Sequence, residues 1–91
     1  MTKVYMIAMA KNRLIKVGFT RNLKKRMKDY RTTNPTAELI GVLDGTMKDE
    51  RQFQNELEDL GFKRIEGTEF FEVPKRISMK KMRETGFLIF A

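Results

Sequence analysis

Two short apolar runs separated by four residues open the chain, and this pattern constrains the fold more than any other feature. Residues 3–9 and 14–20 are apolar and β-prone, and Ala10-Lys11-Asn12-Arg13 between them is compatible with a turn. The pattern predicts a β-hairpin. Because side chains alternate along a strand, Lys16 points away from its two apolar neighbours.

A basic helix is predicted directly after the hairpin. Thr20 or Asn22 can cap its start, and Pro35 requires it to end before Asn34. The apolar stripe of this helix consists of Leu23, Met27 and Tyr30. Lysine and arginine cover the remaining surface, so the helix presents a strongly positive face.

The rest of the chain predicts a further strand, a second helix, a short extra strand and a third helix. Their ranges are residues 37–44, with the middle buried, a helix from Thr46 to Gly61, residues 67–73, and residues 77–85. We expect an α+β fold with a small three-stranded antiparallel sheet (hairpin, helix, strand, helix) flanked by helices. The apolar residues 87–90 are expected to pack into the core, form an edge strand or contact a partner.

Length and composition limit the architecture and the chemistry. Ninety-one residues predict one domain, 1–91, with a core at about 3–74 and a C-terminal helix and tail at 75–91. Cysteine and histidine are absent, which excludes disulfides, zinc-finger sites and histidine bases. No apolar run is long enough to cross a bilayer, and the first residues do not resemble a signal peptide. We expect no membrane partner and a cytoplasmic location, in a bacterial host if the protein is phage-encoded.

Charge is segregated along the chain, whose formal net charge is +7. Residues 1–36 contain ten Lys and Arg against one acid, whereas residues 37–73 contain ten acids against four basic residues. One positive face of this kind favours a polyanion such as DNA or RNA, although a solvated basic surface without a ligand has the same composition.

Four polar residues together suit a phosphodiester hydrolase that works without histidine: Tyr5, Lys16, Arg26 and Glu50. Each alone has an ordinary structural explanation in packing, solvation or helix capping. Such a hydrolase needs a group for the nucleophile, cations for the phosphate charge, and a carboxylate for a divalent metal. Tyr5 fits the first role, Arg26 with Lys16 the second, and Glu50 the third, since one carboxylate suits Mg²⁺ that keeps most of its waters.

At these residues the sequence resembles the GIY-YIG nuclease superfamily, especially its small phage and bacterial branch with a Lys-Ile-Gly-like second signature. The signatures correspond to Val4-Tyr5-Met6-Ile7 and Ile15-Lys16-Val17-Gly18, and the family's arginine-bearing helix to Gly18-Phe-Thr-Arg-Asn-Leu-Lys-Lys-Arg26-Met. Further matches are Arg31-Thr-Thr-Asn-Pro-Thr36, Glu50-Arg-Gln-Phe53-Gln and, for the family's Glu-Trp-Phe ending, Gly67-Thr-Glu69-Phe-Phe71. The resemblance covers about residues 3–74.

This resemblance implies a role for each of the four residues. Tyr5 activates the attacking water, Arg26 stabilises the phosphate, and Glu50 ligates a single Mg²⁺ (or Mn²⁺). Lys16 takes the place of a second tyrosine. An unperturbed lysine pKa of about 10.4 makes Lys16 a phosphate contact and not a neutral base near pH 7.

The leading hypothesis is a metal-dependent endonuclease that hydrolyses DNA, and two alternatives stay open. Tyr30 and Gln54 stand where relatives often have histidine, which favours a catalytically degraded protein that binds nucleic acid or a protein partner without cutting. Such a protein would be a phage or mobile-element accessory or an inhibitor. In the third reading, the acidic middle segment and residues 87–90 form a protein-interaction surface.

Nucleic acid is the predicted partner, with DNA favoured over RNA, and a protein partner or a homodimer also stays open. Contacts to its phosphates are expected from basic side chains of the hairpin turn and first helix. These are Lys11, Arg13, Arg21, Lys24, Lys25, Lys28 and Arg31.

Overall fold

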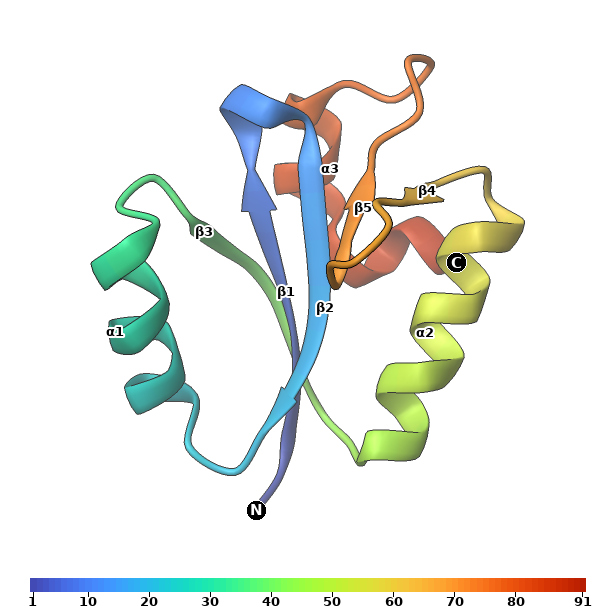
Figure 1. Ribbon diagram of the computed structural model, residues 1–91. Coiled ribbons are helices and arrows are strands. Elements are labelled where there is room, and N and C mark those ends of the chain that lie inside the picture. Colours follow the sequence, from blue (N-terminus) through green and yellow to red (C-terminus); the bar gives the residue numbers. More distant parts are fainter.

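The predicted hairpin forms the centre of a five-stranded antiparallel sheet (Figure 1). A computed structural model describes residues 1–91. Strands β1 (Lys3–Met9) and β2 (Leu14–Thr20) pair along their full length, and the sheet order is β3-β1-β2-β5-β4. The remaining strands are β3 (Glu38–Asp44), β4 (Lys63–Arg64) and β5 (Phe70–Glu72).

The predicted three-stranded sheet is therefore too small. β5, the expected short extra strand, pairs with β2 from Leu14 to Lys16, and β4 then pairs with β5. β4 has only two residues and both are exposed, so it lacks the apolar alternation by which a strand is recognised. Backbone hydrogen bonding to β5 forms this strand without that signal.

Strand β3 lies at the edge of the sheet, which corrects the expectation that its middle is buried. It pairs with β1 on one side only, and Val42 and Leu43 are exposed. The register between β1 and β3 shifts between Met6 and Ile7. An apolar run thus occupies a half-exposed edge, a position that sequence alone does not separate from a central strand.

Three helices flank the sheet, with α1 on one face and α2 and α3 on the other (Figure 1). α1 (Leu23–Thr33) begins where the Asn22 side chain accepts a hydrogen bond from the backbone N–H of Lys25. α2 (Met47–Asp59) begins with the predicted capping box of Thr46 and Asp49. α3 (Met79–Thr85) is shorter than predicted. None of the helices has the length and apolar character needed to cross a membrane.

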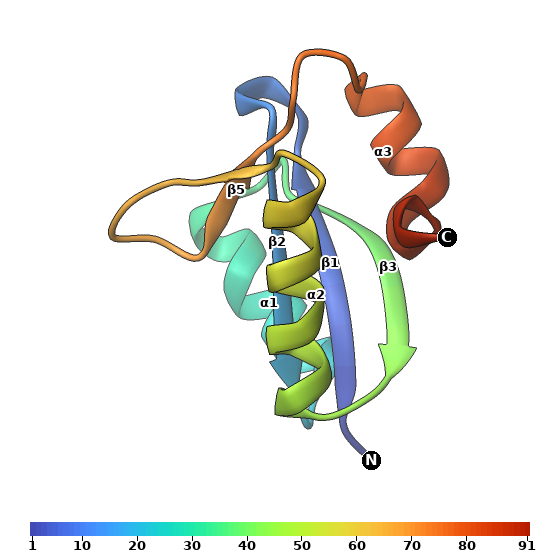
Figure 2. The same cartoon turned by 90° about the vertical axis from the view of Figure 1, so that its right-hand side faces the viewer.

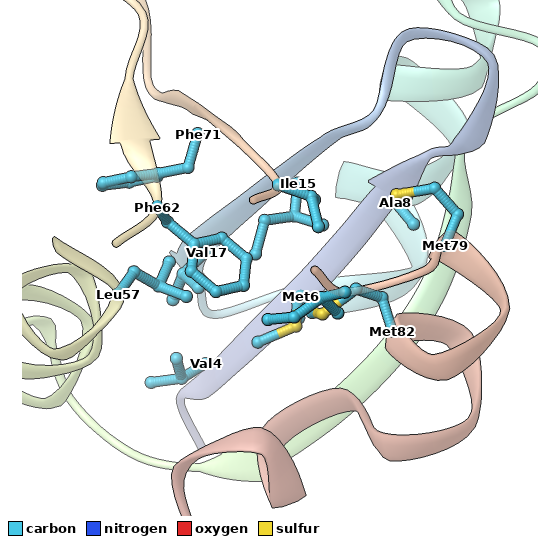
Figure 3. Packing of buried hydrophobic residues seen from close by; sticks show 12 residues of the cluster. Val4, Met6, Ala8, Ile15, Val17, Leu57, Phe62, Phe71, Met79 and Met82 are labelled. Atoms are coloured by element: carbon cyan, nitrogen blue, oxygen red, sulfur yellow. The ribbon is translucent and has the colours of Figure 1, made fainter. Parts of the chain in front are cut away.

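The main core fills the space between the sheet and the pair α2 and α3. Nine of its twelve buried residues come from both hairpin strands, α2, β5 and α3, and the other three, Phe62, Val73 and Ile77, come from connecting segments (Figure 3). The opposite face carries a second cluster of four buried residues beneath α1. These are Tyr5, Ile7, Met27 and Ala37. We refer to the two clusters as the main core and the α1 cluster.

The C-terminal residues pack onto the main core, which is one of the three expected arrangements, and they do not form an edge strand. Gly86–Phe90 form a 3₁₀ helix in which Phe87 and Phe90 lie 4.9 and 5.0 Å from the ring of Phe53. Gly86 has a φ of 50°, and a Cβ there would lie 2.3 Å from the Ile40 carbonyl oxygen. This close approach turns the chain out of α3 and directs the aromatic rings toward α2.

Candidate functional site

The structure places the four predicted site residues on four different elements around the outer edge of β2. Tyr5 lies on β1 and Lys16 on β2, both directed toward the α1 face, while Arg26 lies on α1 and Glu50 in the first turn of α2. Tyr5 is close enough for its electrostatic interaction with Lys16 to favour the charged form of the lysine. The positive charges of Lys16 and Arg26 likewise favour the ionised form of Glu50. The fold thus brings the four side chains into one electrostatic neighbourhood.

Tyr5 has a buried ring, and its hydroxyl is not completely covered. The residue is 1% exposed, and its ring crosses Gly18 so closely that a Cβ on Gly18 would lie 2.3 Å from Tyr5 Cζ and Oη. The hydroxyl has no hydrogen-bond partner in the chain, yet no fully buried side-chain polar atom lacks one. The hydroxyl therefore keeps part of the small exposure that Tyr5 has.

Lys16 is the only charged side chain among the buried residues. Its Nζ lies 2.8 Å from the Glu69 carboxylate and 5.2 Å from the ring centroid of Tyr30. Burial alone would lower the pKa of Lys16, but the hydrogen bond to Glu69 and the nearby phenols of Tyr5 and Tyr30 raise it above its usual 10.5. Lys16 is consequently a cation at neutral pH.

Glu50 is positioned by an anchor one helical turn further along α2. β5 covers β2 only as far as Lys16, and beyond it the side-chain amide of Gln54 donates a 3.1 Å hydrogen bond to the Val17 carbonyl. Glu50 is half-buried and takes part in no ion pair. Burial, followed by the charge of Glu69, raises its pKa above 4.5. A cation bound at this carboxylate would offset both the cost of burying its charge and the repulsion from Glu69.

Arg26 is exposed and makes no ion pair, so its guanidinium donors are available to phosphate oxygens. It borders a polar cavity of about 320 Å³ along α1. The lining residues are Thr20, Asn22, Lys25, Arg26, Asp29, Tyr30, Thr33 and Asn34. The cavity therefore adjoins both the arginine and the tyrosine that faces Lys16.

The predicted phosphate-binding residues separate into two groups. Those near or on α1 are exposed around its positive face: Arg21, Lys24, Lys25, Lys28 and Arg31. Lys11 and Arg13 lie at the hairpin turn, at the opposite end of β2 from α1. The Arg13 guanidinium donates to the carbonyls of Val73, Pro74 and Ile77, so it holds the chain after β5 in place.

Glu69 is the site residue that the sequence interpretation did not single out. It belongs to the segment that resembles the Glu-Trp-Phe ending, which was the one available signal. Its position beside Lys16 depends on the register of β5, in which Phe70 pairs with Lys16. The salt bridge lowers the pKa of Glu69, so this carboxyl is ionised at neutral pH.

The side chains present suit a hydrated divalent ion better than a cage of protein ligands. No group of three or more acidic side chains could surround a metal. Glu50 offers one half-buried, unpaired carboxylate, and Glu69 is near enough to influence its pKa. Mg²⁺ commonly binds through one or two carboxylates and retains several waters, so Glu50 fits this kind of ion.

A comparison with protein families gives a match that covers nearly the whole chain. The model of the T5orf172 domain matches residues 2–85. The chain belongs to the T5orf172 domain family. This family is associated with GIY-YIG-like and HNH-like nucleases, and membership is consistent with interaction with nucleic acid. No curated protein and no solved structure matches this T5orf172 domain significantly.

Proposed function

We propose that this T5orf172 domain is a metal-dependent endonuclease of GIY-YIG type that hydrolyses phosphodiester bonds of DNA. The observation that carries the proposal is the gathering of a tyrosine hydroxyl, a buried ammonium, an unpaired guanidinium and an unpaired carboxylate at the edge of β2. Family membership supports a nuclease-related role in general.

In this proposal each side chain has one task. The Tyr5 hydroxyl accepts a hydrogen bond from the attacking water and orients it. The proton released on attack passes to solvent through this hydroxyl, which gives up its own proton as it receives one. Lys16 and Arg26 bind the non-bridging oxygens and stabilise the negative charge that develops on the phosphate. Glu50 would hold Mg²⁺ or Mn²⁺, which supplies further charge stabilisation when bound. The basic residues of α1 attract the DNA backbone and orient it across the site.

Cleavage of a labelled DNA duplex with Mg²⁺ or Mn²⁺ tests the proposal. Glu50→Gln and Arg26→Ala should each reduce cutting by about 100-fold or more, and Tyr5→Phe should do so by removing one hydroxyl. Glu56→Gln is the matched control, because Glu56 is a half-buried glutamate nearer the other end of α2. Cutting that survives Glu50→Gln and Arg26→Ala unchanged would refute the assigned site.

A second candidate function is binding of nucleic acid without cutting. Gln54 is committed to the Val17 carbonyl and the Tyr30 ring faces Lys16, so neither supplies the proton-transfer group of a histidine. A salt titration of DNA affinity separates this candidate from the protein-interaction alternative, since phosphate contacts make log K fall steeply with log salt. Salt-dependent affinity without cleavage would favour binding alone.

A further inference from the structure

The loop between β4 and β5 delivers a carboxylate to the buried lysine of the site. It projects from the sheet (Figure 2), and Glu69 at its end remains 66% exposed while it pairs with Lys16. The loop is internally braced, because Thr68 donates to Ile65 and accepts from the Phe70 N–H. Pairing of Phe70 with Lys16 in the sheet fixes the register. Glu69 therefore has a defined position beside Lys16.

The charge of Glu69 has two opposed consequences for a phosphate ligand. It lies close to Lys16 and within range of Arg26, the two cations that would bind phosphate, and so it weakens their attraction for an anion. It also restricts the ammonium of Lys16, which ends a flexible four-carbon chain. Besides Arg26, the ionisable groups that face this pair are Tyr5, Tyr30, Glu50 and Arg64, and Arg64 also pairs with Glu58.

We propose that Glu69 is a positioning residue that holds Lys16 charged and directed toward the scissile phosphate, and in doing so weakens ground-state binding of DNA. This inference rests on the proposed nuclease function and adds a residue to its site. Glu69 acts through Lys16 and need not touch the substrate. The raised pKa of Lys16 and the lowered pKa of Glu69 agree with this role.

Glu69→Gln tests the proposal because it removes the charge and keeps the shape and an oxygen acceptor. We expect DNA affinity to rise about threefold to tenfold while kcat falls about tenfold, since tighter binding in the ground state then accompanies poorer orientation in the transition state. Glu66→Gln is the matched control: Glu66 is exposed in the same loop and makes no ion pair. It should leave kcat unchanged.

The pH dependence gives a readout that a merely structural role would not change. Without Glu69, Lys16 should lose its proton at lower pH, so the alkaline limb of the kcat profile should shift to lower pH. Glu69→Asp should restore part of kcat and should return the alkaline limb part of the way to its original pH. A kcat that rises in Glu69→Gln would overturn the proposal, because Glu69 would then restrain the site.

A measurement on the lysine itself separates this inference from the nuclease function. NMR titration of the Lys16 side chain should show a lower pKa in Glu69→Gln than in the wild type, with Lys16→Met identifying the resonance. If the wild type does not cleave DNA, the nuclease function fails, and the positioning role fails with it for lack of a reaction. If the wild type cleaves and the Lys16 pKa is unchanged in Glu69→Gln, the positioning role alone is refuted.

Discussion

The two faces of the sheet differ in what they bury. The face covered by α2 and α3 holds the twelve apolar residues of the main core, whereas the face covered by α1 holds only the four residues of the α1 cluster. Beside the α1 cluster lie Lys16, Tyr30 and Glu69, whose polar groups occupy space that a second core would need. The domain therefore concentrates its apolar core on one face and most of its polar site on the other, and Glu50 reaches the site from the first turn of α2.

Strand alternation produces this division. Along β1, Val4, Met6 and Ala8 enter the main core, and Tyr5 and Ile7 enter the α1 cluster. The same alternation on β2 directs Lys16 toward α1. A single hairpin thus provides both the centre of the main core and the two strand residues of the candidate site.

The largest effect on stability should come from truncating a buried methionine, and its size should differ between the two faces. Met82→Ala empties a position in the main core that is 0% exposed, and we expect it to lower the free energy of unfolding by about 3 kcal/mol. Met27→Ala in the α1 cluster should lower it by about 2 kcal/mol or less, because α1 has fewer buried neighbours and can move inward. Urea unfolding of both variants measures the difference. Equal losses would contradict the division between the faces.

Adding a methyl group on each face in turn should lower stability in both cases but lower DNA cleavage in only one. Gly18→Ala places a Cβ against Tyr5, and Gly41→Ala places one 2.7 Å from the ring of Phe87. Both should destabilise the fold by about 1–3 kcal/mol through overpacking. Only Gly18→Ala should shift the Tyr5 hydroxyl, and we expect it to lower DNA cleavage by about 100-fold at a temperature where both variants are folded. Similar cleavage by the two would argue against Tyr5.

The elements set by local patterns were predictable from the sequence. Alternating apolar residues, the Asn22 cap and the capping box at Thr46 are read within a few neighbouring residues, and the hairpin and first two helices follow from them. What could not be predicted is the order of strands. β5 approaches β2 from about fifty residues further along the chain, and this non-local pairing adds two strands to the sheet.

The candidate site shows the same limit. Chemistry and the family resemblance point to Tyr5, Lys16, Arg26 and Glu50, but Glu69 reaches Lys16 only through the register of β5. The charge of Arg13 predicts a phosphate contact, whereas its three carbonyl partners are brought to it by the chain that follows β5. Residue type predicts what a side chain can bind, whereas its partner depends on the tertiary fold.

A smaller effect should distinguish the basic surfaces on the two faces. Lys24→Ala combined with Lys28→Ala removes two exposed charges from α1, and the slope of log K for DNA against log salt should become shallower by about 2. Lys80→Ala with Lys81→Ala removes the same charge from α3, on the other face, and should leave the slope nearly unchanged. Equal changes would mean that DNA responds to net charge alone.

The smallest effect concerns the stability provided by the ion pair of the site. Glu69 has a lowered pKa in the folded chain, so its contribution is present above its unfolded value near 4.5 and is lost as the pH falls through the folded pKa. Because Glu69 is 66% exposed, solvent screening limits this contribution to less than about 1 kcal/mol.

Urea unfolding should therefore show Glu69→Gln slightly less stable than the wild type at pH 7, with the gap closing near pH 3. High salt at pH 7 should narrow the gap as well, because the exposed carboxylate is accessible to counterions. A gap that stays the same at both pH values would show that packing of the loop, and not charge, connects Glu69 to stability. A gap as large as that of Met82→Ala would place a major part of the stability on the α1 face, against the division between core and site.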